Sequence, residues 1–235
     1  MSSVFRPILE EFQAEMDSLS QLLDVVKTQA ASAKARVAFS NGATLLLAAT
    51  FEEFVRQVAR EFAKIVVSKA RRREDLPKDL LSAVWRRSLD GLGRQRIADL
   101  KSPVELDSFL TDAMSRFSAA HRFCEGDFSQ DIFKDLIHNE NNMRPAELNS
   151  LFRIIGLTDV CTRAATKGGL KDYFGEADDG KIHGSLVSSL NDFIRRRNEI
   201  SHSLNPSSSS SPEQLIRDVD LLKAISLDLV SVLEE

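Results

Sequence analysis

Five polar residues near the end of one predicted helix have side chains suited to chemistry on a phosphate. Arg195, Arg196 and Arg197 form a run of three guanidinium groups, and Asn198 and His202 follow within the next five residues. A guanidinium pairs with phosphate oxygens through parallel hydrogen bonds, and histidine exchanges protons near neutral pH. The pattern predicts a site that recognises a phosphate, with a proton donor or acceptor beside it.

Each of these features also has a structural explanation. A run of three arginines is more often a solvated helix face or a set of ion pairs than a ligand site. A histidine near a helix C-terminus more often compensates the helix dipole than acts in catalysis. The combination is more specific. An arginine in register with the apolar residues, an asparagine and a histidine occur together on one regularly patterned helix, which ends just after the histidine.

The helical periodicity places Arg197 at an unusual position. At 100° per residue, Leu186, Leu190 and Phe193 line one face of the helix, and Arg197 falls at the centre of that face. A permanently charged side chain there needs a partner, a cleft or an interface, since burying it alone is costly. The opposite side carries a polar stripe made of Asn191, Arg195, Asn198 and His202.

Four helices that must position these residues are predicted from apolar residues that recur at steps of three and four. They cover about 5–28, 43–68, 184–204 and 213–234. The middle, about 75–180, is less regular and is expected to form shorter helices inserted into this framework. No segment alternates in the way a strand does. The sequence therefore predicts an all-α helical bundle, with residues 1–235 forming a single domain.

Capping residues mark the ends of several predicted helices. Asn41 and Gly42 are expected to precede the second framework helix. Ser102 is expected to cap a helix that starts at Pro103 and runs to about Phe117. Gly156 is expected to end a short helix in the middle of the chain.

The composition excludes several classes of protein. Hydrophobic residues make up 43% of the chain and charged residues 28%, with few glycines and prolines, so collagen-like and wholly disordered proteins are excluded. The net charge of −4 means that binding to a polyanion would require a local basic patch. Only 7% of the residues are aromatic, fewer than proteins that stack single-stranded bases usually have.

The cysteines and the apolar segments indicate a cytoplasmic protein. Cys124 and Cys161 lie far apart without a CxxC motif, which favours a reduced pair over a disulfide or a zinc site. The first residues lack the features of a signal peptide, and the most apolar stretch, 43–51, is shorter than the ~20 residues of a membrane span. With no cluster of metal ligands and no glycine-rich phosphate loop, neither a metal nor a cofactor is expected.

Three segments of the chain resemble one protein family. The hexapeptide Arg197-Asn198-Glu199-Ile200-Ser201-His202 resembles the Rx4–6H signature of HEPN domains (higher eukaryotes and prokaryotes nucleotide-binding). Residues 41–55 are similar to the early core helix of the RiboL-PSP-HEPN-like branch, and residues 142–156 are similar to a middle segment of that branch. The resemblance extends over about 40–204.

The resemblance implies a HEPN-type helical bundle that forms a homodimer and acts as a metal-independent endoribonuclease. In such enzymes the motif helices of two protomers meet and form one composite site. About 140° separates Arg197 and His202 on one ideal helix, so the two side chains of one copy cannot easily contact the same phosphate. A symmetric dimer, which brings two copies of the motif together, removes this difficulty. The resemblance further implies a toxin or phage-defence effector, restrained by an antitoxin or another regulatory protein.

The residue types suit this chemistry. His202 could take the proton from a ribose 2′-OH or donate one to the leaving 5′-oxygen, and Arg197 would stabilise the charge that develops on the phosphate. Asn198 would orient the phosphate or the histidine, with Arg195 and Arg196 binding RNA phosphates. By resemblance, the products carry a 2′,3′-cyclic phosphate and a 5′-OH, and DNA is inert because it lacks the 2′-OH.

Two other interpretations are compatible with the sequence. The chain could be a non-catalytic HEPN module that binds nucleotide, RNA or a partner protein, or a helical scaffold in which the motif occurs by chance. Glu52 and Glu53 are candidates for pairing with an arginine of the motif helix, in a structural or a catalytic role. Three arginine groups could extend a basic surface for RNA or could be solvated: 71–73, Arg86 with Arg87, and Arg94 with Arg96.

Overall fold

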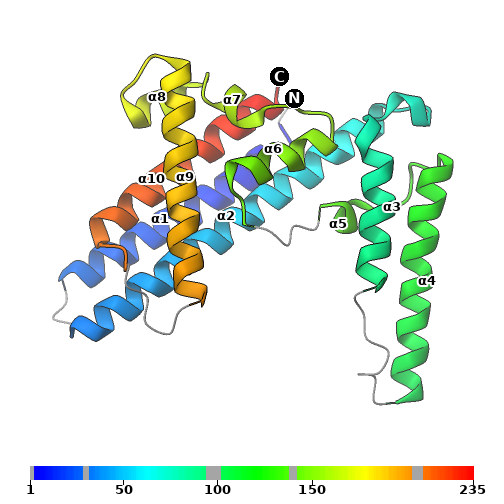
Figure 1. The fold of residues 1–235 in the computed structure, drawn as a ribbon, viewed down its shortest axis with the longest axis horizontal. Coiled ribbons are helices and arrows are strands. Elements are labelled where there is room, and N and C mark those ends of the chain that lie inside the picture. Colours follow the sequence, from blue (N-terminus) through cyan, green and yellow to red (C-terminus); the bar gives the residue numbers. More distant parts are fainter. Residues whose placement is uncertain (1–2, 29–31, 94–101, 138–141, 203–208) are drawn as a thin grey trace. The chain divides into compact units, whose positions relative to one another are not determined.

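The computed structural model describes residues 3–28, 32–93, 102–137, 142–202 and 209–235. Every regular element in these ranges is a helix, which confirms the prediction of an all-α protein (Figure 1). The longer helices are α1 (Arg6–Thr28), α2 (Ala33–Lys69), α3 (Lys78–Gly93), α4 (Pro103–Glu125), α9 (Asp179–His202) and α10 (Pro212–Leu233). The shorter helices are η1 (Arg73–Asp75), α5 (Phe133–Leu136), α6 (Pro145–Ile154), α7 (Val160–Ala164) and α8 (Gly168–Phe174).

Contacts between residues divide the chain into two compact units. Unit 1 consists of Met1–Val58, Asn141–Asn149 and Asp159–Glu235. Unit 2 consists of Ala59–Glu140 and Ser150–Thr158. The motif helix α9 therefore belongs to unit 1, whereas α3 and α4 belong to unit 2. That residues 1–235 form one domain stays a prediction.

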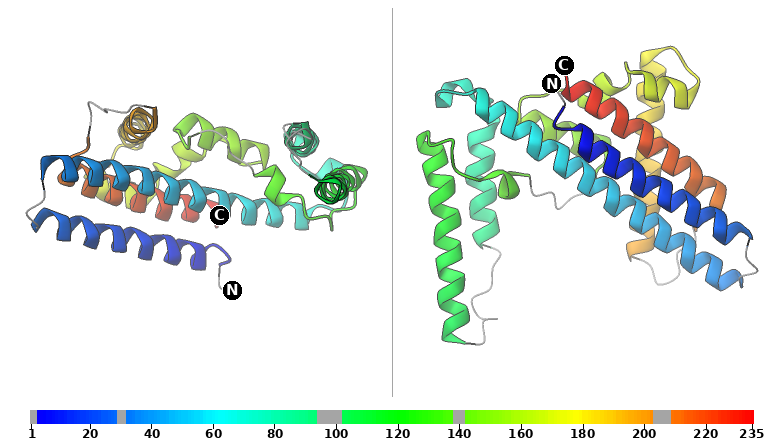
Figure 2. Two further views of the ribbon diagram at one scale, coloured as in Figure 1. Left: turned by 90° about the horizontal axis from the view of Figure 1, so that it is seen from below. Right: turned by 180° about the vertical axis from the view of Figure 1, so that it is seen from behind.

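Unit 1 is built around α10 and the first part of α2. Figure 2 shows α1 on one side of these two helices and α9 crossing them on the other side. The ring of Phe12 packs against Phe51 and Phe54, with centroid distances of 6.3 and 4.5 Å. Met16 and Leu47 are fully buried beside them. The apolar stripes that predicted these helices therefore form one core, against which α9 is held.

Helix α2 begins at Ala33, earlier than the start near 43 that the sequence predicts. Asn41 and Gly42 lie inside the helix rather than before it. A glycine within a helix costs about 1 kcal/mol relative to alanine, and a cost of this size is readily outweighed by tertiary packing. Ser40 and Thr44, which flank the glycine, are both buried, so packing against the rest of unit 1 explains the continuous helix.

Helix α8 packs against α9 and α10, and one buried carboxylate joins it to α10. The carboxylate of Asp228 accepts hydrogen bonds from the backbone N–H groups of Gly169 and Leu170, at 2.9 and 2.6 Å. These N–H groups lie in the first turn of α8, where a helix has no backbone acceptors of its own. Burial nevertheless raises the pKa of Asp228. The buried residues of α9 are Ile182, Leu186, Leu190, Phe193, Ile194 and Arg196.

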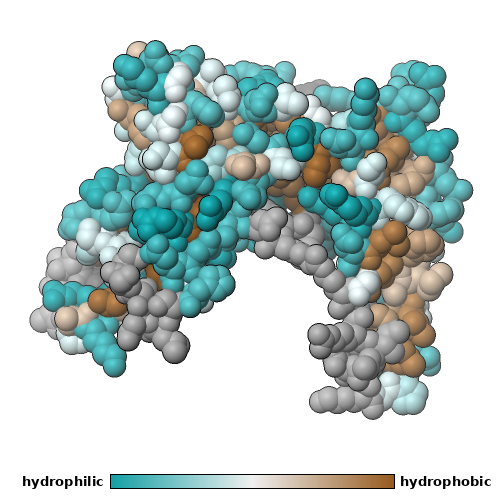
Figure 3. Space-filling model, in the orientation of Figure 1, coloured by the Kyte–Doolittle hydropathy of each residue, from teal (hydrophilic) through white to brown (hydrophobic). Residues whose placement is uncertain are grey.

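Unit 2 contains the antiparallel pair α3 and α4. Ser102 caps α4 as the sequence predicts: its side chain accepts from the N–H of Glu105, whose carboxylate accepts from the N–H of Ser102. The helix continues beyond the expected end near Phe117 and stops at Gly126, which has φ 110°. Figure 3 shows hydrophobic side chains on the surface of this pair. Its exposed large apolar residues are Trp85, Leu89, Val104, Leu110 and Met114.

The structure also bears on the membrane and cysteine predictions. In the described part of the chain, no helix combines the length and the apolar composition of a membrane span. Cys124 and Cys161 are free thiols, as the sequence predicts. Burial raises the pKa of Cys161 to about 12, so this thiol is inert rather than nucleophilic.

Candidate functional site

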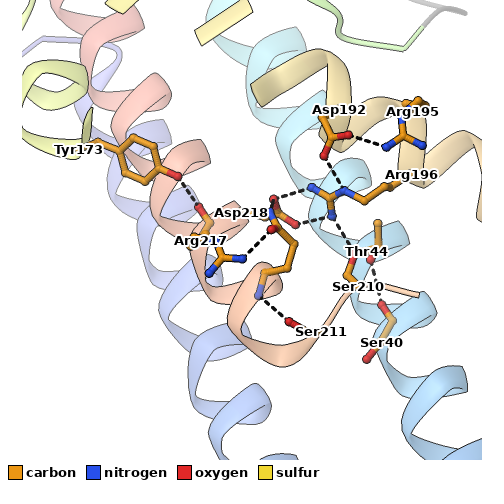
Figure 4. A network of polar contacts seen from close by, with 11 residues as sticks. Ser40, Thr44, Tyr173, Asp192, Arg195, Arg196, Ser210, Ser211, Arg217 and Asp218 are labelled. Atoms are coloured by element: carbon orange, nitrogen blue, oxygen red, sulfur yellow. Dashed lines mark hydrogen bonds and ion pairs between the residues drawn. The ribbon is translucent and has the colours of Figure 1, made fainter. Parts of the chain in front are cut away.

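The three consecutive arginines of α9 have three different environments. Arg196 lies in the interior of unit 1, and its guanidinium forms two hydrogen bonds of 2.8 Å with the carboxylate of Asp218 on α10 (Figure 4). Its Nε donates to Asp192 at 3.0 Å, and its Nη1 also donates to Ser210 at 2.7 Å. Burial alone would lower the pKa of Arg196, but the hydrogen bonds and charge of Asp218 raise it above its usual value.

Arg196 is therefore a structural residue of the bundle. Its side chain is 8% exposed and each of its nitrogen atoms already has an acceptor, so it cannot also reach a ligand. The assignment of Arg196 to phosphate binding is thus corrected by the geometry. The periodicity placed Arg197 at the centre of the apolar face, but the structure buries the preceding residue instead. A helical wheel does not show that α10 brings a carboxylate to this position.

Arg195 lies on the outer surface of α9. Its side chain is 54% exposed, and its two terminal nitrogens pair with Asp192 and Glu199, both at 2.6 Å. Asp192 is shared with Arg196; burial would raise the pKa of Asp192, but the two arginines hold it below its ordinary value. Surface pairs of this kind contribute little to stability, so Arg195 could exchange its carboxylates for another anion.

Arg197 differs from its two neighbours in the acceptors of its hydrogen bonds. Its Nη1 donates to the side-chain oxygen of Asn142 at 2.6 Å and to that of Asn198 at 3.1 Å. The nearest carboxylate oxygen in an ion pair with it belongs to Glu52, 3.7 Å from Nη2. Its side chain is 27% exposed. Arg197 is thus fixed by two neutral amide oxygens and remains accessible from solvent.

Glu52 approaches the site from α2. Its side chain is 11% exposed, and its Oε1 has no hydrogen-bond partner among the described residues. Burial raises the pKa of Glu52, although the charges of Arg197 and Arg56 act in the opposite direction. The expected pairing with the motif helix is thus confirmed for Glu52, whereas Glu53 pairs with Arg56 of its own helix at 2.8 Å.

The remaining motif residues lie towards the end of α9. Asn198 is half-buried, with its oxygen directed at Arg197. His202 is exposed at the last residue of the helix, and residues 203–204 of the predicted helix lie outside the described part of the chain. Arg197 and His202 are about 140° apart around an ideal helix. A single α9 therefore does not present both side chains on one face.

Asn142 is the site residue that sequence analysis missed. The segment that begins at Asn142 was recognised by its resemblance to a family segment, but no role was assigned to the residue itself. It lies 55 residues before Arg197, so no local periodicity could connect the two. The only available signal was an asparagine standing just before the start of a short helix, at Pro145.

The other basic clusters belong to unit 2 or lie outside the described residues. In unit 2, Arg87 is half-buried and donates to the backbone carbonyl of Leu136, so it is occupied. Arg94 and Arg96 lie outside the described residues. In the described ranges, no group of three His, Cys, Asp or Glu side chains gathers in the way that holds a metal ion.

The arrangement around Arg197 is suited to binding a phosphate. Its amide partners fix the direction of the guanidinium and add no charge, and Glu52 approaches it only to 3.7 Å. A guanidinium presents paired donors that match phosphate oxygens. The profile of the RiboL-PSP-HEPN family matches residues 10–235, and no curated protein and no solved structure gives a match. The chain belongs to the RiboL-PSP-HEPN family.

Proposed function

We propose that the protein is a metal-independent endoribonuclease that cuts RNA through attack by the ribose 2′-OH. Membership of the HEPN family indicates a nuclease-like or RNA-related module. The observation that carries the proposal is that the hydrogen bonds of Arg197 go to the neutral amides of Asn142 and Asn198, while its carboxylate neighbour, Glu52, lies farther away at 3.7 Å. The two preceding arginines instead have carboxylate oxygens at 2.6–2.8 Å. The positive charge of the Arg197 guanidinium is then available to bind an anionic substrate.

In the proposed reaction, His202 takes the proton from the 2′-OH as its oxygen attacks the phosphorus atom. The bond from phosphorus to the 5′-oxygen breaks, and that oxygen receives a proton from a second acid or from solvent. Arg197 stabilises the negative charge that builds on the phosphate oxygens. The products are a 2′,3′-cyclic phosphate and a 5′-OH, so the reaction consumes no metal, cofactor or enzyme nucleophile.

The test is a cleavage assay on mixed RNA and matching DNA in excess EDTA. We expect the wild type to cut only RNA and His202→Ala to lose cleavage. The control is His121→Ala, because His121 is also an exposed helical histidine but lies in unit 2. Cleavage that survives in His202→Ala would refute the role of His202.

The active form is proposed to be a homodimer in which Arg197 of one copy acts with His202 of the other. Arg197→Ala and His202→Ala would each be inactive, yet the composite site of a mixed dimer would keep one of its two Arg197–His202 pairs intact. Random mixing after subunit exchange would therefore restore about a quarter of wild-type activity. A mixture that stays inactive while subunits demonstrably exchange would exclude a shared site. Arg197→Ala that sediments as a monomer would assign that residue to assembly as well.

A second candidate is a non-catalytic module that binds nucleotide or RNA phosphate. It is favoured by the exposed position of His202 at the helix end, since Arg197 and its amides suffice to hold a phosphate without it. Binding of RNA without cleavage by the wild type would support this function. By family resemblance, we further propose that an antitoxin or regulatory protein restrains the enzyme and that it acts as a toxin or defence effector in the cytoplasm.

A further inference from the structure

The acceptors around the three arginines differ in charge. Arg195 pairs with two carboxylates, Asp192 and Glu199, and Arg196 pairs with Asp192 and Asp218. The hydrogen bonds that the structure records for the Arg197 side chain end instead on amide oxygens, those of Asn142 and Asn198, and its ion pair with Glu52, at 3.7 Å, is longer than a hydrogen bond. One of these amides is adjacent in sequence, but the other comes from the segment before α6.

The two kinds of acceptor have different consequences for a bound anion. A carboxylate within hydrogen-bond distance holds a guanidinium strongly but compensates its charge. An amide oxygen holds the same N–H in the same direction and leaves the net charge in place. At 2.6 Å from Nη1, Asn142 is the closer of the two amides, so it contributes most to fixing the guanidinium.

We propose that Asn142 is a positioning residue, whose uncharged amide oxygen fixes Arg197 while leaving its positive charge available to an RNA phosphate. This inference rests on the proposed function, because it names the residue that prepares Arg197 for that role. It assigns a task to the segment before α6, which the hexapeptide motif does not include. It also predicts that the neutrality of residue 142 matters as much as its hydrogen bond.

Two substitutions separate the hydrogen bond from the charge. Asn142→Ala removes the acceptor and leaves Arg197 charged but poorly directed, so we expect kcat to fall ~100-fold with a small change in KM. Asn142→Asp keeps an acceptor oxygen in place but compensates Arg197, so we expect weaker RNA binding in addition to a similar loss of kcat. If Asn142 had a purely structural role, the isosteric Asn142→Asp would leave kcat and RNA binding unchanged.

Binding is measured separately with a 2′-O-methyl RNA oligonucleotide, which lacks the attacking hydroxyl. We expect Asn142→Asp to bind it ~10-fold more weakly and to lose about one released counterion from the salt dependence. Asn142→Ala is expected to retain the salt dependence of the wild type, because the charge of Arg197 is unchanged.

Asn149→Asp provides the matched control. Asn149 lies in the same segment of unit 1, and its side-chain oxygen accepts a hydrogen bond from the backbone N–H of Cys161 at 3.0 Å. An aspartate there adds the same charge and keeps the acceptor, so cleavage and binding are expected to stay at wild-type levels. Thermal unfolding of all variants shows whether any loss comes from misfolding.

The outcomes distinguish this inference from the proposed function. Wild-type protein that binds the 2′-O-methyl RNA but cuts no RNA, with binding weakened in Asn142→Asp, would overturn the nuclease and support the role of Asn142. Wild-type cleavage that persists in a folded Asn142→Asp variant with unchanged binding would overturn the role of Asn142 and keep the nuclease. Wild-type protein that neither binds nor cuts would overturn both.

Discussion

The buried pair between Arg196 and Asp218 allows a quantitative prediction. Arg196→Met removes the guanidinium and leaves the carboxylate of Asp218, whose side chain is 3% exposed, without its cationic partner. Removing one member of a buried ion pair typically costs about 3–5 kcal/mol. Asp218 keeps one hydrogen bond from the side-chain amide of Gln214 at 3.0 Å, so we expect the lower end of this range, about 3 kcal/mol.

The assay is thermal and urea unfolding of single and double variants. A loss of about 3 kcal/mol corresponds to a fall in Tm of roughly 6–12 °C for a chain of this size. Arg195→Ala is the control, because its ion pairs are exposed and a much smaller loss of stability is expected. The double variant Arg196→Met/Asp218→Leu is expected to recover most of the stability, since no unpaired charge then remains buried.

Two results would refute this account of Arg196. One is a loss of stability in Arg196→Met that is no larger than the loss in Arg195→Ala. The other is a double variant that is less stable than Arg196→Met, because that outcome would mean that Asp218 stabilises the fold independently of Arg196. Either result would also remove the reason for treating Arg196 as structural, and its assignment to phosphate binding would return.

Three further predictions concern stability. Burial raises the pKa of Glu52 from its ordinary value of 4.5, so its ionisation costs stability as pH rises above that value. Glu52→Gln should therefore have a higher Tm than the wild type at pH 8, with the difference shrinking towards pH 4.5. Gly169→Ala places a Cβ atom 2.9 Å from a carboxylate oxygen of Asp228, so a loss of about 1–3 kcal/mol is expected in urea unfolding. Phe12→Ala removes a ring that packs on two others and is expected to cost about 3–5 kcal/mol in the same assay.

Each of these predictions has an outcome that contradicts it. A Tm of Glu52→Gln below that of the wild type at pH 8, with the gap closing towards acidic pH, would mean that the pKa of Glu52 is lowered rather than raised. Unchanged stability in Gly169→Ala would show that Asp228 can move away from the first turn of α8 without cost. A loss below about 1 kcal/mol in Phe12→Ala would place α1 outside the cooperative core.

The framework helices could be predicted because their apolar residues recur with the helical period. The prediction was wrong at the start of α2, because Gly42 and Asn41 resemble a helix boundary, whereas packing of their buried neighbours continues the helix. The site was only partly predictable for a similar reason. Arg197, Asn198 and His202 are adjacent in sequence and carry a family signature, but Asn142 contacts Arg197 from 55 residues away. The sequence predicts that Arg197 faces the core, but Arg196 is buried there instead because it pairs with Asp218, a residue of another helix.

The position of Asp218 on the last helix also affects the order in which the protein can fold during synthesis. Asp218 follows Arg196 by 22 residues, and ribosomes add about 5–20 residues per second. Asp218 is therefore added to the chain roughly 1–4 s after Arg196. Until then, α9 carries a cation on the face that it must bury. The nascent chain therefore cannot complete the packing behind Arg197 until α10 has emerged, and translation itself delays the formation of the site.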